Sequence, residues 1–403
     1  MIAGLVFGFL PLAAWVYLLL LRDGFWRLRE RDTQPVTQPL EWPSVVAVVP
    51  ARNEADVIQH SIASLIAQDY PGDFHVILVD DQSDDGTGEL ARGLGSARLS
   101  VVTGAERPRG WTGKLWAMRQ GSDLATARAP EFVWFTDADI AHAPDTLRSL
   151  VARAEEEAAG RPRVLVSLMA RLNCKSPAEH FLIPAFVFFF DMLFPFGAVN
   201  DPGRKVAAAA GGCMLARRDA LEAAGGITAI KDQIIDDCAL GRLMKAQGPI
   251  WLGLSDRSIS LRPYPHIADI AQMVTRSAYA QLSYSPLLLA GTLLGLVMLY
   301  LAPVATALFA WGISQLAGWL AWIIMAVMFV PILRFYRLSW LWGFALPLIG
   351  VFYAVFTLQS AIQHWSGRGG MWKGRAQASE VKASEAKASG VQASDIENGT
   401  DTP

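Results

Sequence analysis

The sequence predicts an α/β domain set between membrane helices. From Ser44 onward, short apolar runs typical of strands alternate with helical stretches, which is the pattern of a parallel sheet with helical crossovers. Two of these runs end in clustered carboxylates, which favours a ligand site at one edge of the sheet. Long uncharged runs lie towards both ends of the chain, and 52% of the 403 residues are hydrophobic.

Charge and cysteine content exclude several classes of protein. The formal net charge is -2, so no nucleic-acid-binding surface is indicated and nucleic acid is not an expected partner. The cysteines, Cys174, Cys213 and Cys238, are odd in number and widely separated. They fit neither a disulfide framework nor a zinc site, and they favour a reducing compartment.

The first element is an uncharged run over residues 2–21, long enough to cross a bilayer as a helix. Basic residues such as Arg22 and Arg27 follow this run instead of preceding it, unlike the order in a cleaved signal peptide. The positive-inside rule then places the amino end outside and the following domain in the cytoplasm. We predict a transmembrane helix over 1–22 and a linker over 23–43.

Three strands come next, over residues 45–49, 74–79 and 99–102. The second strand ends in an acidic turn that begins with Asp80 and Asp81, which is typical either of a helix cap or of a ligand loop. Lys114 begins the helix after the third strand. It is either a surface lysine or a cation that faces the carboxylates, and the second role suits a nucleotide diphosphate.

The fourth strand, residues 132–135, leads directly to Asp137 and Asp139. Side chains two residues apart on an extended segment point the same way, so both carboxylates can face one site. Two like charges this close favour a cation between them, and a divalent ion that carries phosphate oxygens fits. An ordinary Asp-rich turn is the alternative for an isolated motif of this kind.

The second half of the domain contains three further features. The Phe-rich run 181–196 is too short to span a bilayer, so it is either a buried core helix or an interfacial helix that leads a lipid acceptor to the site. Gly211 and Gly212 either form a tight turn or let the backbone approach a ligand closely. Asp236 and Asp237 precede a helical stretch, where a carboxylate is either a cap or a general base.

The carboxyl-terminal part predicts about three membrane helices over 282–366. No Asp, Glu, Lys, Arg or His occurs over residues 277–333, a length sufficient for two spans with a break near Gly312. Arg334 and Arg337 close this stretch, and another apolar run follows over 338–362. The basic residues beyond it conflict with an odd number of spans, so one segment is re-entrant or lies flat. Residues 367–403 read as a disordered tail.

Several motifs resemble the family-two glycosyltransferases with a GT-A fold. In chain order they are Pro50 to Glu54, Asp80 to Thr87, Gly113-Lys114, Asp137-Ala138-Asp139 and Asp236-Asp237. A narrower resemblance, to the hopanoid-biosynthesis-associated glycosyltransferases of bacteria, rests on Thr136 to Ile140, the Phe-rich run from Ile183, Ala210 to Met214 and Ile235 to Leu240. The resemblance is dense over residues 45–281, within a predicted cytoplasmic domain of 44–281, and looser over the membrane helices.

This resemblance implies an inverting transfer of a sugar from a nucleotide-sugar, most simply a UDP-sugar, to a membrane lipid hydroxyl in hopanoid biosynthesis. It implies a multi-pass protein of the bacterial inner membrane. The implied nucleotide-binding residues are Pro50, Arg52, Glu54, Asp80, Asp81, Lys114, Asp137 and Arg276. Asp137 and Asp139 would bind Mg2+ or Mn2+, Asp237 would be the general base beside Asp236, and Gly211, Gly212 and Cys213 would lie on the acceptor side.

The sequence departs from the family at its closing motif, Gln-x-x-Arg-Trp. The nearest match, Met273 to Ser277, keeps Arg276 and lacks the glutamine and the tryptophan. Arg276 can still face a pyrophosphate, whereas acceptor binding through the aromatic ring is not supported. Two alternatives therefore stay open, namely a polyprenyl-phosphate acceptor and a non-catalytic member that binds lipid or acts as a scaffold.

Overall fold

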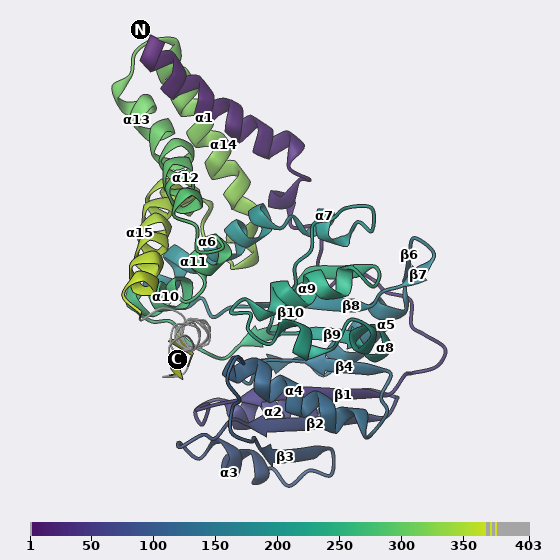
Figure 1. The fold of residues 1–403 in the computed structure, drawn as a ribbon. Coiled ribbons are helices and arrows are strands. Elements are labelled where there is room, and N and C mark those ends of the chain that lie inside the picture. Colours follow the sequence, from purple (N-terminus) through teal and green to yellow (C-terminus); the bar gives the residue numbers. More distant parts are fainter. Residues whose placement is uncertain (1, 368–370, 373–374, 377–403) are drawn as a thin grey trace, which may run out of the picture.

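A computed structural model describes residues 2–367, 371–372 and 375–376. It has two parts, a sheet covered by helices on both faces and a group of long helices that extends from one end of it (Figure 1). The predicted tail, residues 367–403, falls almost entirely outside the described residues.

The sheet has eight strands in the order β3-β2-β1-β4-β9-β8-β10-β5. Their bounds are β1 (Val45–Ala51), β2 (Phe74–Asp80), β3 (Leu99–Thr103), β4 (Phe132–Phe135), β5 (Ile140–His142), β8 (Leu165–Arg171), β9 (Met214–Arg217) and β10 (Ile250–Ser260). The first four are parallel, with Ala51 opposite Asp80 and Val48 opposite Phe135. Their carboxyl ends therefore meet at one edge of the sheet, as predicted.

The other half of the sheet is mixed, which differs from the parallel sheet that the sequence pattern suggests. Strand β9 runs antiparallel to both β4 and β8, and β5 runs antiparallel to β10. The chain reaches β9 only after a long excursion among the helices, and it returns to the sheet in the opposite direction. A connection of this length could also have served a parallel neighbour, so the sequence pattern alone leaves the direction of β9 open. The sheet is thus Rossmann-like in its first half only, as in a GT-A-like fold.

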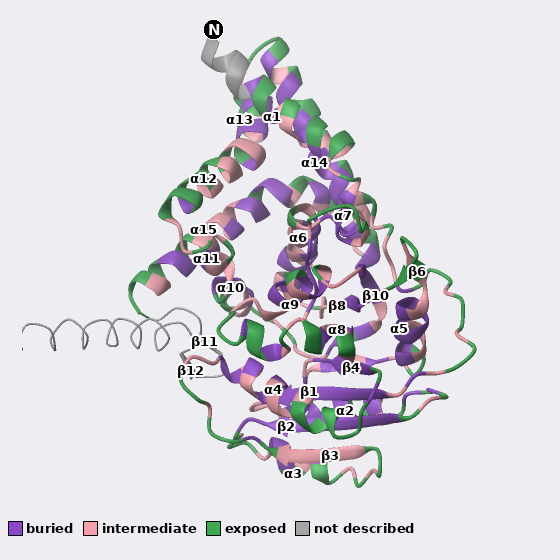
Figure 2. Ribbon diagram, turned by 45° about the vertical axis from the view of Figure 1, so that its right-hand side comes forward, coloured by how far each residue is buried: buried purple, intermediate pink, exposed green. Residues whose placement is uncertain are grey.

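Helices cover the sheet on both faces. They are α2 (Ile58–Ile66), α3 (Thr87–Arg92), α4 (Gly113–Thr126), α5 (Thr146–Glu155), α8 (Arg218–Ala223) and α9 (Asp236–Lys245). Val45, Ala47 and Val49 of β1 pack in one core cluster with α2 and α5, while Val46 and Val48 belong to the other cluster with α4. Because β1 is buried on both faces (Figure 2), its sequence is uniformly apolar instead of alternating.

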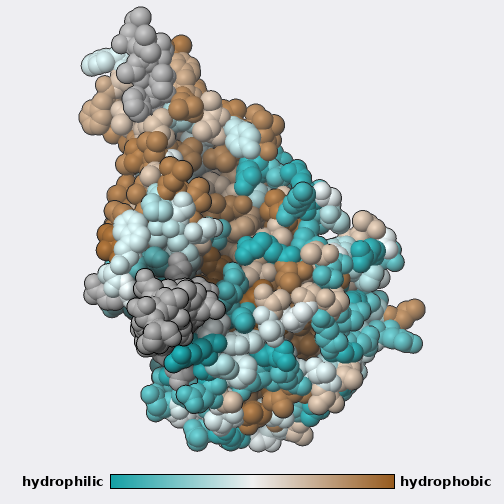
Figure 3. Space-filling view, in the orientation of Figure 1, coloured by the Kyte–Doolittle hydropathy of each residue, from teal (hydrophilic) through white to brown (hydrophobic). Residues whose placement is uncertain are grey.

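The helical part contains α1 (Ile2–Leu21), α12 (Pro286–Leu296), η3 (Val297–Leu301), α13 (Ala302–Phe309), α14 (Ile313–Phe335), η4 (Trp340–Ala345) and α15 (Leu346–Trp365). Among the residues that the structure describes, three stretches could cross a membrane by length and composition: Pro286–Phe309, Ile313–Phe335 and Trp340–Trp365. This confirms the three carboxyl-terminal helices and the break at Gly312, whose φ is +64°. Apolar side chains gather over this part of the surface (Figure 3).

Two segments join the parts. Helix α6 (Pro177–Leu193) and α7 (Phe196–Asn200) contain the Phe-rich run, and Ile183, Val187 and Phe188 of α6 are buried in the cluster that also includes residues of α14 and α15. Helix α10 (Ile267–Thr275) contacts both α6 and α15, and α11 (Ala278–Gln281) follows it. One apolar core thus continues from the sheet into the long helices.

The segment between α1 and β1 is fixed to the sheet. It contains η1 (Phe25–Arg27), and its Asp32 is 3% exposed. The Asp32 carboxylate accepts hydrogen bonds from the Ser255 hydroxyl and from the backbone N–H groups of Asp256 and Arg257. The first helix is therefore connected to the middle of β10 as well as to β1. The remaining elements are β6 (Glu157–Ala158), β7 (Arg161–Pro162), η2 (Ile227–Ile230), β11 (Met371–Trp372) and β12 (Arg375–Ala376).

Candidate active site

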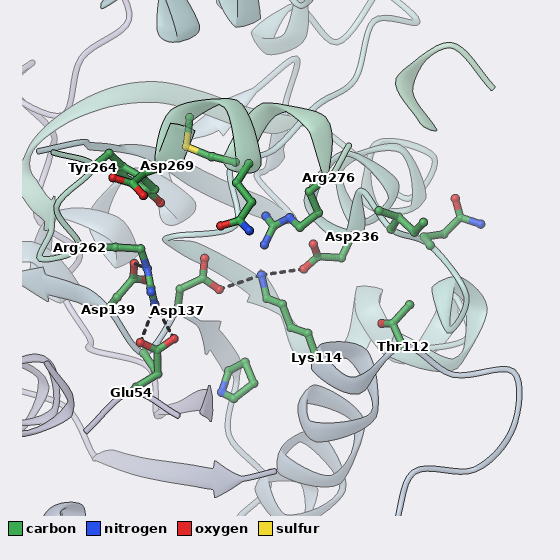
Figure 4. A pocket seen from close by; sticks show the side chains of 16 residues that line it. Glu54, Thr112, Lys114, Asp137, Asp139, Asp236, Arg262, Tyr264, Asp269 and Arg276 are labelled. Carbon is green, nitrogen blue, oxygen red and sulfur yellow. Dashed lines mark hydrogen bonds and ion pairs between the residues drawn. The ribbon is translucent and has the colours of Figure 1, made fainter. Parts of the chain in front are cut away.

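A cavity of about 420 Å³ lies at the carboxyl ends of β1 and β4. Parallel α/β sheets bind ligands at this edge. Loops after the strands and the start of α4 form one side, and α10 forms the other (Figure 4). The lining residues are Pro50, Glu54, Thr112, Lys114, Asp137, Ala138, Asp139, Gln233, Ile234, Asp236, Arg262, Tyr264, Asp269, Gln272, Met273 and Arg276.

Lys114 lies between two carboxylates in this cavity. Its ammonium nitrogen is 2.7 Å from Asp137 Oδ1 and 2.9 Å from Asp236 Oδ2. Burial lowers the pKa of Lys114, but the two carboxylates raise it more, so that the pKa lies above its usual value. The lysine is in the first turn of α4, which Thr112 caps by accepting from the Leu115 N–H at 3.3 Å.

Arg262 forms a second bridge between two carboxylates, and it is not among the residues predicted from the sequence. Its guanidinium donates to Asp139 Oδ2 at 3.1 Å and to Glu54 Oε1 at 2.7 Å. The Leu261 N–H donates to the Asp139 carbonyl at 2.8 Å, which holds the segment after β10 against the loop after β4. Burial lowers the pKa of Arg262, and Glu54 and Asp139 raise it above its usual value.

Asp237 differs from its neighbour Asp236. It is absent from the cavity lining, and its carboxylate accepts from the Gly211 N–H at 3.1 Å and the Cys238 N–H at 2.7 Å. Burial, together with the charge of Asp236, raises the pKa of Asp237 to about 6 despite the opposing effect of Lys114. A carboxylate with such a pKa is suited to general-base chemistry near neutral pH.

The Gly211–Cys213 segment has one member at the site. A Cβ added at Gly211 would lie 3.2 Å from Lys114 Nζ and 3.6 Å from Asp137 Oδ2. A Cβ at Gly212 would instead meet Ala170 and Ile140 side chains. The structure does not bring Cys213 to the cavity, because its buried thiol lies in the core and accepts from Trp134 Nε1 at 3.3 Å.

Five site residues are predicted after the first and second strands. Pro50 and Glu54 line the cavity, whereas Arg52, Asp80 and Asp81 lie outside its lining and support it. The Arg52 guanidinium donates to the backbone carbonyl of Gln82 at 3.1 Å, and the Ser83 N–H donates to Asp80 Oδ1 at 3.0 Å. Asp81 is fully buried. These contacts hold the loops after β1 and β2 together.

Helix α10 places Gln272 and Arg276 in the cavity wall. Residues four apart lie on the same face of a helix, so the Gln272 amide lies beside Arg276. The family motif Gln-x-x-Arg-Trp places its glutamine three residues before the arginine, where this chain has Met273. Matching the motif at that spacing therefore does not find Gln272. Ser277 occupies the position of the family tryptophan.

Arg262 and Tyr264 have a signal of their own in the sequence. They lie in Leu-Arg-Pro-Tyr-Pro, a proline-rich turn directly after the strand Ile250–Ser260, which begins with the apolar run 250–254. The predicted site residues lie in polar turns that follow other strands. The same criterion, a polar turn directly after a strand, would select Arg262 and Tyr264. Burial, together with Asp139, raises the pKa of Tyr264 to about 12, so its hydroxyl stays protonated.

The carboxylates fit a divalent ion that arrives with a phosphate ligand. Within the described ranges, no group of three or more His, Cys, Asp or Glu side chains is placed to hold a metal ion. Asp137 and Asp139 nevertheless offer the hard oxygen donors that Mg2+ and Mn2+ take, and such ions are commonly held by one or two carboxylates together with substrate phosphates.

Comparison with known proteins finds similarity over most of the sheet domain. Residues 46–225 match the family model described as glycosyl transferase family 2. The chain is 29% identical over 224 residues to the 4,4'-diaponeurosporenoate glycosyltransferase of Staphylococcus aureus, a match that covers 54% of this chain and 56% of that protein. The chain thus spans about half the length of the curated relatives it matches.

A solved structure shares the fold over most of the chain. The mannosyltransferase of Pyrobaculum calidifontis, in complex with GDP-Man and Mn2+, aligns with a TM-score of 0.52 and 20% identity. The alignment covers 89% of this chain and 98% of that chain, so it includes the sheet domain and most of the helical part.

Gly211→Ala tests the close approach at the site. We expect the added methyl group to displace the Lys114 ammonium and to weaken binding of a nucleotide diphosphate about ten-fold, because the charge-assisted contact is misplaced. The control is Gly291→Ala in α12, where a Cβ meets nothing within 4 Å. Calorimetric titration of UDP and GDP measures the effect. Equal affinities for both variants would contradict the placement of the ligand beside Gly211.

Arg262→Gln tests the second bridge. Removal of the guanidinium takes away the cation that Asp139 shares with Glu54, so Mn2+ should bind at Asp139 in the absence of nucleotide, unlike in the unmodified chain. We also expect the free energy of unfolding to fall by about 1–3 kcal/mol, a range reduced for the partial exposure of the pair. Arg92→Gln, which removes a surface ion pair with Glu89, is the control. Electron paramagnetic resonance of Mn2+ reads out binding, and nucleotide-independent Mn2+ binding by the unmodified chain would contradict this account.

Proposed function

Because residues 46–225 match the family model of glycosyl transferase family 2, we propose that this chain is an inverting, metal-dependent glycosyltransferase. It moves a sugar from a nucleotide-sugar to the hydroxyl group of a membrane lipid. The observation that carries the proposal is the cavity in which Lys114, Arg262 and Arg276 face Asp137 and Asp139 beside the apolar helices.

The cations and carboxylates suit the diphosphate of the donor. Lys114 and Arg276 provide positive charge for phosphate oxygens, and Asp137 and Asp139 would hold Mg2+ or Mn2+. The ion would neutralise charge on the leaving diphosphate. Pro50 and Glu54 in the cavity wall, backed by Arg52, Asp80 and Asp81, form the proposed nucleoside side. We propose UDP as the carrier, with GDP as the alternative because the structural neighbour was solved with GDP-Man.

Asp237 is the proposed general base. The acceptor oxygen forms a bond to the anomeric carbon while the bond from that carbon to the diphosphate breaks, and the hydroxyl proton passes to Asp237. A direct displacement of this kind inverts the anomeric configuration. Asp236 is less suited to the role because its carboxylate already pairs with Lys114 at 2.9 Å.

The acceptor is proposed to come from the membrane. Helix α10 lines the cavity with Gln272 and Met273, while its Ile270 and Val274 are buried in the cluster shared with α6, α14 and α15. The Ser360 hydroxyl of α15 donates to the Thr275 carbonyl at the end of α10. A lipid that lies against these helices therefore has a short path to the site. The α6 segment over 181–196 stays a candidate for the interfacial part of this path.

We propose a hopanoid hydroxyl as the acceptor and a polyprenyl phosphate as the second candidate. The proposed location is the bacterial inner membrane, with the sheet domain in the cytoplasm. The basic residues Arg22, Arg334 and Arg337, which follow apolar runs on the side of the sheet domain, support this orientation. Lipid extracts incubated with labelled donor separate the acceptors, because only the modified lipid becomes labelled.

Nucleotide binding is the first test. Calorimetry on the full chain in detergent should show binding of UDP that requires Mn2+ or Mg2+, and Asp139→Ala should abolish the metal-dependent part. GDP serves as the comparison nucleotide. Binding of neither nucleotide, with or without metal, would favour a non-catalytic member of the family, a reading that the missing tryptophan at Ser277 would then support.

Asp237→Asn tests the base. The substitution should leave UDP binding within about two-fold and lower the transfer rate about 10²–10⁴-fold. Asp236→Asn, the matched comparison, should tighten UDP binding, because it removes a negative charge that competes with the diphosphate for Lys114. An Asp237→Asn variant with normal turnover would remove Asp237 from the mechanism.

The pH dependence follows from the raised pKa of Asp237. Because a base must be ionised to accept a proton, kcat/KM should rise with pH through about 6. The folded-state pKa lies above the usual value, so ionisation of this group opposes folding, and its cost increases as the pH rises through about 6. Asp237→Asn should therefore raise the Tm at pH 7.5 but not at pH 4. A Tm difference that is equal at both pH values would contradict the assigned pKa.

A further inference from the structure

A second cavity lies apart from the active site, where α14 ends against the sheet domain. Its volume is about 610 Å³, and its lining residues are Arg31, Arg171, Asp256, Ile259, Pro331, Arg334, Phe335 and Arg337. Four of them are arginines, contributed by the segment before β1, by the end of β8 and by the end of α14. None of these residues lines the active-site cavity.

Most of the positive charge in this second cavity is not neutralised. Arg31 pairs with Asp256, the only acidic lining residue. Within the described part of the chain, the side chains of Arg171, Arg334 and Arg337 have no hydrogen bond or ion pair to a protein group. The guanidinium groups of Arg31 and Arg171 lie 5.1 Å and 5.4 Å from the centroid of the Phe335 ring. The cavity therefore carries a net charge of about +3 that is open to an anion.

Helix α14 connects this cavity to the apolar surface. Leu316, Leu320, Ile323 and Val327 are 44–58% exposed, and their spacing of four, three and four residues puts them on one face. Pro331 and Arg334 continue the same spacing into the cavity. From Leu316 to Arg334 the stripe is about 27 Å long at 1.5 Å per residue, close to a ~30 Å hydrocarbon core. Its part from Ile323 onward, about 16 Å, has the length of one leaflet and ends at the arginines.

The backbone at Arg337 is adapted to this position. The Leu338 N–H donates to the Leu333 carbonyl at 2.8 Å and the Arg337 N–H to the Arg334 carbonyl at 3.0 Å, which is the Schellman ending of a helix. Arg337 has a φ of +59°, where glycine is the usual residue. The chain carries a guanidinium at a position that the backbone alone would assign to glycine.

We propose that this cavity binds the phosphate headgroup of an anionic membrane phospholipid, whose acyl chain lies along the α14 stripe. Basic pockets at the ends of membrane helices bind such headgroups. A free phosphate would use the same arginines but not the stripe, so the apolar face favours the lipid. A lipid bound here contacts both α14 and the edge of the sheet domain, and it fixes the height of the active site above the membrane.

The experiment is a titration of the full chain in detergent with phosphatidylglycerol, followed by native mass spectrometry, with phosphatidylcholine as the comparison lipid. We expect tighter binding of phosphatidylglycerol. Arg334→Gln and Arg337→Gly should each weaken it about five-fold, and the double variant should weaken it more than about ten-fold. Arg337→Gly relieves the left-handed backbone strain and should raise the Tm, so the loss cannot come from misfolding.

The control is Arg128→Gln, which removes one exposed positive charge beyond the end of α4. Its affinity for phosphatidylglycerol should stay within about two-fold of the unmodified chain. Three results would overturn the proposal: unchanged binding by the double variant, an equal loss in Arg128→Gln, or complete displacement of the lipid by millimolar inorganic phosphate. The last result would assign the cavity to a free phosphate.

Discussion

Two cations, each shared by two carboxylates, organise the candidate site. Lys114 bridges the end of β4 to the start of α9 through Asp137 and Asp236, and Arg262 bridges the loops after β1 and β4 through Glu54 and Asp139. Like charges at one sheet edge would otherwise repel strongly in a partly buried cavity. Five segments far apart in the sequence, those of Glu54, Lys114, Asp137 with Asp139, Asp236 and Arg262, are therefore held together by charge balance. A charged ligand that enters must replace some of these ion pairs with its own.

The same arrangement explains why the two carboxylates at the start of α9 differ. Asp236 pairs with Lys114, while Asp237, half-buried beside Asp236, has a raised pKa. Carboxyl groups with a strongly shifted pKa are common at catalytic sites. The cost is that an ionised Asp237 opposes folding at neutral pH, a conflict between stability and activity that is usual at active sites.

The site and the long helices form one structural unit. The apolar cluster beneath α4 continues through α6 into α14 and α15, and α10 has one face in the cavity and another in this cluster. A rigid connection of this kind keeps the cavity at a fixed distance from the surface of the long helices. The second cavity, with its arginines at the end of α14, lies along the same junction.

The sequence by itself determined the strand and helix alternation, the three long apolar helices and the edge at which the site lies, because each depends on local periodicity, length or the ends of parallel strands. It also predicted that one site contains Asp137, Asp139, Lys114 and Asp236. Only the tertiary structure decided that β9 runs antiparallel, that Arg262 and Gln272 face the cavity and that Cys213 lies in the core. These features depend on which segments far apart in the sequence pack together, and local pattern does not encode such contacts.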